Sequence, residues 1–215
     1  MAQETPPSRT EGVVSATNRS TARRADDFYR TPAWVVRALL ESEPLHGPIL
    51  EPACGDGSII SQILESGVCR PELLVGVEIH RARAESAAAN RWGSRVVWGN
   101  FLEGLDCWQH IEPRPCAIIT NPPYRHAAAF IRRSLEVVQP GGKVCMLLRL
   151  NFLGSSRKRL DVVGADSGLS RVIVLAKRPS FTGTGTDACE YAWMIWIKGY
   201  RGDPRISVYN EGAST

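Results

Sequence analysis

The segment that most constrains the fold of this chain is residues 116–124, where the apolar run Cys-Ala-Ile-Ile-Thr is followed directly by Asn-Pro-Pro-Tyr. Proline has no N–H to donate to a sheet, and it forces the residue before it out of the helical region. The apolar run therefore predicts a buried strand that ends at Thr120. In an open α/β sheet, ligands bind beyond the carboxyl ends of the strands. We therefore expect Asn121 and Tyr124 to lie at the mouth of a site.

The Asn-Pro-Pro-Tyr segment carries groups suited to holding an amino group. Asn121 offers a side-chain carbonyl, and Pro122 and Pro123 offer backbone carbonyls without a competing N–H. Tyr124 adds a flat face on which a planar ring can stack. An ordinary turn after a strand is the alternative reading, because Asn and Pro are common turn residues.

A second motif lies upstream, in Ile-Leu-Glu-Pro-Ala-Cys-Gly-Asp-Gly-Ser at residues 49–58. It predicts a short strand, a glycine turn and a helix, because Gly55 and Gly57 tolerate positive φ and let a ligand approach the backbone. Glu51 and Asp56 make this turn acidic, which disfavours a pyrophosphate and favours a positively charged ligand such as an ammonium or a sulfonium. A plain strand-to-helix connection is the alternative.

Two further strands carry polar residues at their ends. Residues 73–79 predict a buried strand with Glu78 near its end, about 20 positions beyond the glycine turn, where a carboxylate can accept both hydroxyls of a ribose. Residues 95–102 place Asn100 and Phe101 where an amide and an apolar face can contact an adenine ring. For Glu78 taken alone, a solvated strand end is the alternative.

The order of these motifs, EPACGDGS, VGVEIH, GNFLE and NPPY, resembles that of class I S-adenosylmethionine-dependent methyltransferases acting on exocyclic amino groups. DFYRTPAW at 27–34 and RPSFTG at 178–183 resemble more narrowly the adenine N6 DNA methyltransferases of phages and prophages. The similarity covers residues 26–198. It implies an α/β fold with a Rossmann-like, seven-stranded mixed sheet, helices on both faces and an antiparallel last strand. Asn100 departs from the family, in which many members have Asp.

The resemblance also implies roles for individual residues. The N6 amino group of adenine would be held by the Asn121 side chain and the Pro122 carbonyl, and a base flipped out of duplex DNA would stack on Tyr124. The implied cofactor is S-adenosyl-L-methionine, the implied partner is DNA, and no metal is expected. The expected catalytic residues are Asn121, Pro122, Pro123 and Tyr124; the expected substrate contacts are Tyr124, Phe181, Arg149, Arg157 and Lys158; the expected cofactor contacts are Phe28, Tyr29, Thr31, Pro32, Glu51, Pro52, Ala53, Gly55, Asp56, Gly57, Glu78, Ile79, Asn100, Phe101 and Asn121.

Basic residues suggest where a nucleic acid would bind. The net charge of +4 and the pI near 8.8 permit such binding without demonstrating it. For any single basic residue, a solvated charged face is the alternative. The candidates for phosphate contact follow the fifth strand and the Asn-Pro-Pro-Tyr segment, and they are Arg149, Arg157, Lys158, Arg159, Arg171, Arg125, His126, Arg132 and Arg133.

The remaining pattern completes the expected architecture. Thr31 and Pro32 predict a helix start, with Thr as N-cap and Pro at the first helical position. The last strand places Tyr191 and Trp193 on one face and Trp196 on the other, which predicts burial on both sides. The expected helices are residues 33–40 and 126–138, and the expected later strands are residues 143–149, 170–176 and 188–198.

Composition sets bounds on the whole. A chain of 215 residues can build one domain with a substantial core, and its sequence has no apolar run of about 18 residues that would span a membrane. Six cysteines without a CxxC pair favour reduced, buried thiols in a cytoplasmic protein, and the acids near Cys54 disfavour its thiolate. We expect a disordered tail at 1–25, a catalytic domain at 26–200 and a C-terminal extension at 201–215.

Several functions share these motifs. Cytosine N4 methylation of DNA, adenine methylation of RNA and glutamine methylation of protein use related amino-group chemistry. An alternative from another class of function is a non-catalytic S-adenosylmethionine-binding regulatory protein. The intact Asn-Pro-Pro-Tyr segment argues against this last reading.

Overall fold

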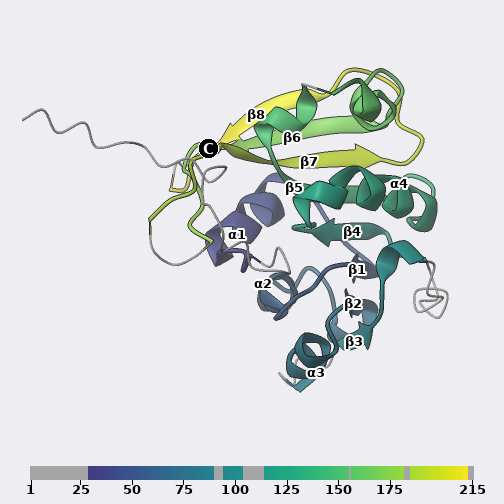
Figure 1. The fold of residues 1–215 in the computed structure, drawn as a ribbon, viewed down its shortest axis with the longest axis vertical. Coiled ribbons are helices and arrows are strands. Elements are labelled where there is room, and N and C mark those ends of the chain that lie inside the picture. Colours follow the sequence, from purple (N-terminus) through teal and green to yellow (C-terminus); the bar gives the residue numbers. More distant parts are fainter. Residues whose placement is uncertain (1–28, 90–93, 104–113, 155, 182–184, 213–215) are drawn as a thin grey trace, which may run out of the picture.

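The computed structural model describes residues 29–89, 94–103, 114–154, 156–181 and 185–212, and Figure 1 shows these forming one sheet with helices on both sides. The tail expected at 1–25 lies outside the described residues. The strands follow the order β3-β2-β1-β4-β5-β7-β6-β8. They are β1 (Ile49–Glu51), β2 (Leu74–Glu78), β3 (Arg95–Trp98), β4 (Ala117–Thr120), β5 (Lys143–Arg149), β6 (Leu169–Leu175), β7 (Tyr191–Ile197) and β8 (Arg205–Tyr209).

Strand direction gathers one set of strand ends at a single edge of the sheet. Among the described strands, β7 alone runs antiparallel, and it does so to both of its neighbours, β5 and β6. The other pairings are parallel. The prediction of a mixed sheet with an antiparallel seventh strand is therefore confirmed. The carboxyl ends of β1 to β4 meet at one edge, where the Asn-Pro-Pro-Tyr segment emerges from β4.

The sheet has an eighth strand that the sequence reading did not anticipate. β8 lies within residues 201–215, the segment expected to be a C-terminal extension, and it pairs in parallel with β6. It is also held to the first helix, because the Tyr209 hydroxyl donates to Glu41 at 2.7 Å and Arg37 pairs with Glu211 at 2.9 Å. The folded unit therefore continues past residue 200.

Helices cover both faces of the sheet, as predicted. α1 and α2 pack into one hydrophobic cluster with one face of the sheet, and α4 and α5 contribute to a second cluster on the opposite face. α3 packs against β2 and β3. The helices are α1 (Ala33–Ser42), α2 (Ser58–Glu65), α3 (Arg81–Ala89), α4 (Ala127–Val137) and α5 (Leu160–Val163), and the short 3-10 turns are η2 (Pro71–Leu73), η3 (Phe101–Glu103), η5 (Tyr124–His126), η6 (Leu150–Leu153) and η7 (Arg157–Arg159).

β7 joins the two layers through its aromatic side chains. Tyr191 and Trp193 belong to the cluster on the α1 side, and Trp196 belongs to the cluster on the α5 side, which confirms the predicted burial on both faces. Each indole N–H finds a backbone acceptor, because Trp193 donates to the Val35 carbonyl at 2.7 Å and Trp196 donates to the Val162 carbonyl at 2.6 Å. A buried Trp needs such a partner to avoid an unsatisfied polar group.

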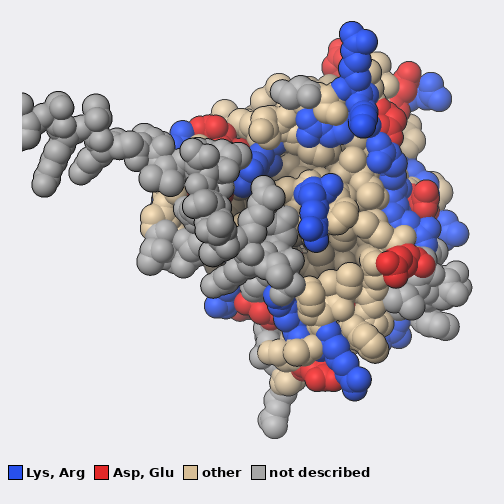
Figure 2. All heavy atoms as spheres, in the orientation of Figure 1, with Lys and Arg blue, Asp and Glu red and all other residues tan. Residues whose placement is uncertain are grey.

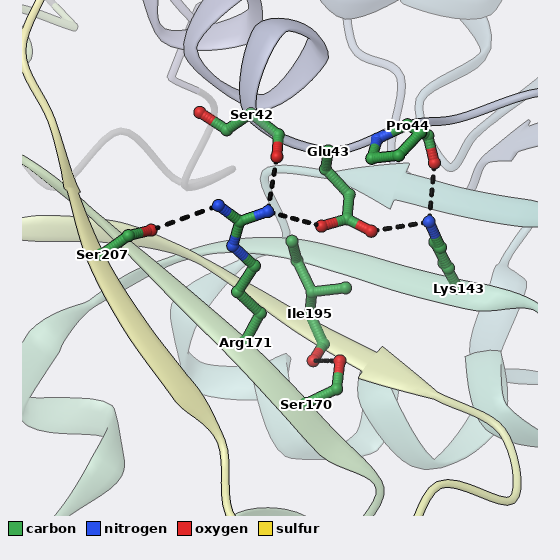
Figure 3. A network of polar contacts seen from close by, with 8 residues as sticks. All are labelled: Ser42, Glu43, Pro44, Lys143, Ser170, Arg171, Ile195 and Ser207. Atoms are coloured by element: carbon green, nitrogen blue, oxygen red, sulfur yellow. Dashed lines mark hydrogen bonds and ion pairs between the residues drawn. The ribbon is translucent and has the colours of Figure 1, made fainter. Parts of the chain in front are cut away.

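A buried carboxylate fastens the end of α1 to the sheet (Figure 3). Glu43 is only 8% exposed and accepts from Lys143 of β5 at 2.6 Å and from Arg171 of β6 at 3.1 Å. Arg171 also donates to the Ser42 carbonyl and to the Ser207 hydroxyl of β8. The sequence reading of Arg171 as a phosphate contact beside the site is therefore wrong, since its guanidinium is held at the amino-terminal part of β6.

Two element boundaries differ from the predictions. Pro32, not Thr31, is the N-cap of α1, and no side chain caps this helix. β3 ends at Trp98, so Asn100 and Phe101 lie in the turn that follows. In the part of the chain that the structure describes, no helix combines the length and apolar character needed to cross a bilayer.

Candidate functional site

A cavity of about 490 Å³ opens at the carboxyl edge of the sheet. It collects the four polar residues at strand ends that the sequence singled out: Glu51 is the last residue of β1, Glu78 is the last residue of β2, and Asn100 and Asn121 follow β3 and β4. This convergence follows from the parallel arrangement, because neighbouring parallel strands end side by side. Of the other expected cofactor residues, those that also line the cavity are Tyr29, Thr31, Pro52, Ala53, Ile79 and Phe101.

The glycine turn adopts the conformation that its glycines make possible. Gly55 has φ of 56° and Gly57 has φ of 80°, so both occupy the left-handed region that side chains disfavour. Gly57 is the N-cap of α2. The Cys54 N–H donates to the Val77 carbonyl at 2.9 Å, which fixes the turn against β2.

Glu78 links this turn to the end of β2. Its carboxylate accepts from the Gly55 N–H and from the His80 N–H, each at 2.8 Å, and its side chain is buried. An ionised carboxylate has about four acceptor positions, so two remain for a ligand. The two backbone hydrogen bonds hold the group in one orientation at the cavity wall.

Glu51 is the most deeply buried acid of the cavity. It is 1% exposed, and its Oε2 has no hydrogen-bond partner among the described residues. Burial raises the pKa of Glu51 well above its ordinary value, and the charges of Asp56 and Glu78 raise it further. A buried, unpartnered carboxylate oxygen in a cavity is suited to a cationic donor, which would favour the ionised form.

Replacing Glu51 by Gln should change how stability depends on pH. A raised folded-state pKa means that the contribution of Glu51 to stability is present below the unfolded-state pKa and is lost as the pH rises through the folded-state pKa. Each pH unit between the two pKa values corresponds to about 1.4 kcal/mol. We expect the variant to gain stability relative to the ligand-free wild-type protein as the pH rises from about 4 towards neutrality. Urea denaturation across this range checks the result.

The exposed Glu72 supplies the matched control for this measurement, since its side chain is 63% exposed. Glu72→Gln should leave the pH profile of stability close to that of the wild-type protein. Parallel profiles for Glu51→Gln and wild type would show that burial does not disfavour the Glu51 charge.

Asp56 turns away from the cavity. Its carboxylate accepts from the Ser58 N–H at 3.1 Å and pairs with Arg30 at 3.3 Å near the surface. Gly55, Asp56 and Gly57 are not part of the cavity lining, although the acidic residue contributes to the potential felt by Glu51. Cys54 lines the cavity, and burial followed by the charges of Glu51 and Glu78 raises the pKa of its thiol, as the sequence predicted.

The side chain of Asn121 is held by the segment that precedes α1. Its Nδ2 donates to the Thr31 hydroxyl at 3.2 Å and to the Tyr29 carbonyl at 3.4 Å. Fixing the amide nitrogen in this way leaves Oδ1 as the acceptor available to a ligand. Pro123 lines the cavity, whereas Pro122 is buried beside it.

The adenine-contact candidates lie on the far side of the same cavity. Asn100 uses its Oδ1 to accept from the Leu102 N–H at 3.0 Å, which caps η3 and leaves the amide N–H groups as donors. Phe101 is buried against Phe130, with ring centroids 5.5 Å apart. Ile79 is 54% exposed although it is large and apolar, and it offers a surface on which a planar ring can lie.

Tyr124 is placed differently from the expectation. It does not line the cavity, and its ring packs among Tyr29, Tyr191 and the Arg149 guanidinium, which lies 5.1 Å from the ring centroid. Burial raises the pKa of Tyr124 well above its ordinary value, so the phenol is neutral and is not a base. Phe181 joins this group with its ring centroid 5.1 Å from that of Tyr191.

Arg149 belongs to this aromatic group rather than to an open surface. It donates to the Tyr191 hydroxyl at 3.1 Å, and that hydroxyl donates to Asp187 at 3.0 Å. These contacts place Arg149 behind Tyr124, so the structure does not support its expected role in phosphate contact. Arg157 and Lys158 are exposed on η7, after the carboxyl end of β5.

The sequence reading missed some residues of the site and named others that do not line the cavity or lie outside the described residues. Phe28 lies outside the described residues, and Pro32 and Phe181 line a second hollow next to the cavity. The sequence predicted Tyr191 only as a buried strand residue and gave Asp187 no role, because no local pattern reveals that Tyr191 contacts Tyr124 or that its hydroxyl donates to Asp187. Further cavity residues that the sequence reading did not assign to the site are Ser58, Ile59, His80, Arg83, Gly99, Leu102, Glu103 and Phe130. No cluster of metal-ligating side chains occurs among the described residues.

Comparison with known proteins defines the fold. No protein-family model and no curated protein matches the sequence. A putative class I S-adenosylmethionine-dependent methyltransferase from Listeria monocytogenes aligns with a TM-score of 0.59 and 13% identity, covering 84% of this chain and 63% of that one. The M protein of the EcoKI type I restriction enzyme aligns with a TM-score of 0.59 and 18% identity, covering 82% of this chain and 45% of that one. A modification subunit of a putative type I restriction enzyme from Vibrio vulnificus aligns with a TM-score of 0.63 and 17% identity, covering 89% of this chain and 49% of that one.

These alignments show that the chain has the class I S-adenosylmethionine-dependent methyltransferase fold. At identities of 13% to 18% they show no more than the fold. The chain spans between 45% and 63% of the length of these three proteins.

Proposed function

We propose that this protein transfers a methyl group from S-adenosyl-L-methionine to the exocyclic N6 amino group of adenine in DNA. The observation that carries the proposal is the single cavity in which a fixed Asn121 amide lies with the acids Glu51 and Glu78. One end of this cavity suits an amino group, and the other suits a nucleoside with a positively charged side chain.

The residues of the cavity fit the proposed cofactor. The unpartnered oxygen of Glu51 suits the ammonium of the methionine part, and the free acceptor positions of Glu78 suit the ribose hydroxyls. Asn100, Phe101 and Ile79 offer an amide and apolar surfaces for the adenine ring. When bound, S-adenosylmethionine supplies an electrophilic methyl group carried on a sulfonium.

The chain itself supplies positioning and electrostatic stabilisation. The amino nitrogen of adenine is a poor nucleophile because its lone pair is delocalised into the ring. Asn121 Oδ1 and the Pro122 carbonyl would accept its two N–H bonds, which localises the lone pair and stabilises the positive charge that develops on nitrogen. Thr31 keeps the amide in the orientation that this requires. A strong base is not needed, which agrees with the neutral Tyr124 phenol.

DNA is proposed as the substrate because of the surface around the cavity and the modification subunits among the similar structures. Arg125 and His126 line the cavity and are exposed, while Arg157 and Lys158 are exposed after β5. On the face drawn in Figure 2, basic side chains gather mainly along the right-hand side, opposite the edge towards which β4 points in Figure 1, so they are not part of the surface around the cavity. A base inside a duplex cannot reach such a cavity, so the target would be flipped out or single-stranded. We place this reaction in the cytoplasm of a bacterial or phage-infected cell.

The test is incubation with methyl-labelled S-adenosylmethionine and separate pools of duplex DNA, single-stranded DNA, RNA and protein, followed by nucleoside or amino-acid analysis. Labelled N6-methyladenine in DNA is the expected product. Labelled N4-methylcytosine, or label in RNA or in protein glutamine, would show that the substrate is one of these groups and not adenine in DNA. Cofactor binding without transfer to any pool would indicate a regulatory cofactor-binding protein.

Changing Arg157 and Lys158 together to Ala should weaken binding to duplex oligonucleotides of any sequence. If each contacts one phosphate, the slope of log K against log salt concentration should become less steep by about 2. Fluorescence anisotropy at several salt concentrations measures this slope. The control is Arg70→Ala with Arg205→Ala, because both residues lie at the amino-end edge of the sheet. An equal loss in the two double variants would show that net charge alone, and not this surface, determines binding.

A further inference from the structure

Tyr29 lies between the cavity and the ring on which the target base is expected to stack. Its ring is nearly parallel to that of Tyr124, with an interplanar angle of 19° and centroids 6.4 Å apart. Tyr29 lines the cavity, whereas Tyr124 does not. A planar base entering the cavity would therefore meet Tyr29 before it meets Tyr124.

The same ring contacts the other residue expected to enclose the base. Tyr29 and Phe181 meet edge to face, with centroids 5.9 Å apart. Phe181 and Tyr124 both contact Tyr191 behind them, at 5.1 Å and 5.9 Å between centroids. Tyr29 thus fills the space next to both of the rings that are expected to enclose the base, and Tyr191 contacts both of those rings as well.

Tyr29 can leave this space without releasing Asn121. The atom of Tyr29 that accepts from Asn121 is its backbone carbonyl, and the Thr31 hydroxyl provides a second acceptor. The Tyr29 residue is 38% exposed, whereas Tyr124 is held by the Arg149 guanidinium and Tyr191. Rotation of one partly exposed side chain would open the space while the catalytic amide stays in place.

We infer that the Tyr29 ring fills the target-base site of the free protein and must be displaced when an extrahelical adenine stacks on Tyr124. This inference rests on the proposed adenine chemistry of the same site. Tyr29 is then a specificity-determining residue. A base displaces the Tyr29 ring only if it stacks on Tyr124 at least as favourably as that ring does. The affinity for a base is reduced by the fraction of molecules in which Tyr29 still fills the site.

Tyr29→Ala tests the inference through the direction of its effect. The probes are a short oligo(dA) and an abasic oligonucleotide of the same length, each titrated into full-length protein with S-adenosylhomocysteine present. Removing the Tyr29 ring should tighten oligo(dA) binding by about 2- to 10-fold, the range expected for one aromatic pair, and leave binding of the abasic strand unchanged. Tyr29→Phe, which keeps the ring, should restore the wild-type difference between the two probes.

Three outcomes would overturn the inference. Weaker oligo(dA) binding by Tyr29→Ala would make Tyr29 a fixed wall of the site, and unchanged binding would make it irrelevant to the base. Equal binding of oligo(dA) and the abasic strand by the wild-type protein would show that no base enters. Failure of the proposed function is seen separately, as absence of N6-methyladenine when methyl transfer is assayed, because this binding experiment involves no transfer.

Discussion

Asn121→Ala should abolish measurable methyl transfer while S-adenosylmethionine affinity stays within a few-fold of the wild-type value. Removing one preorganised group that stabilises developing charge typically lowers kcat by about 10²- to 10³-fold, and the lost acceptor also misplaces the amino group. In the proposed binding mode the cofactor contacts mainly the acids Glu51 and Glu78, which line the same cavity. Single-turnover transfer to DNA and calorimetric titration with the cofactor measure the two quantities separately.

Asn210→Ala is the matched control, because Asn210 is exposed just beyond β8 and does not line the cavity. It should behave as the wild-type protein in both measurements. Wild-type transfer by Asn121→Ala would refute the proposed mechanism. A parallel loss of cofactor affinity and transfer would instead assign Asn121 to cofactor binding.

Glu78→Ala should weaken cofactor binding by about 10- to 100-fold, and more if both ribose hydroxyls donate to it. A hydrogen bond to a charged group contributes about 1.5 to 3 kcal/mol. The substitution also removes the acceptor of the Gly55 and His80 N–H groups, so the glycine turn loses one of its fixed contacts. Isothermal titration gives the affinity, and circular dichroism establishes that the variant is folded.

Glu72 again provides the comparison, since it lies in η2 before the opposite end of β2 and is exposed. Glu72→Ala should leave cofactor affinity unchanged. If Glu78→Ala is folded and binds the cofactor as the wild-type protein does, Glu78 has no part in the site.

The strand-end residues of the site could be read from sequence because each is fixed locally. Two prolines stop β4 after Thr120, and two glycines turn the chain after β1. Once the strands are taken as parallel, their carboxyl ends must meet at one edge, and Glu51, Glu78, Asn100 and Asn121 come together without further information. The burial of β7 on both faces was predicted by a different local pattern, the large apolar side chains Tyr191, Trp193 and Trp196 on its alternate faces.

What the sequence could not show depends on contacts between distant segments. Nothing near Arg171 reveals that Glu43, 128 positions earlier, will hold it, and nothing near Arg149 reveals the Tyr191 hydroxyl. From the sequence alone, a basic residue that contacts phosphate cannot be distinguished from one that pairs with a buried carboxylate. Tyr124 was likewise expected in the open because its own segment gives no sign that Tyr29 covers it.

β8 changes where this protein can be cut or tagged. Tyr209 and Glu211 contact Glu41 and Arg37 of α1, so residues beyond 200 support the same helix whose preceding segment orients the Asn121 amide. An expression boundary chosen at residue 200 from family resemblance alone would leave Glu41 and Arg37 without these partners. A carboxyl-terminal affinity tag should therefore follow a spacer placed after residue 215, so that Tyr209 and Glu211 keep their contacts with α1.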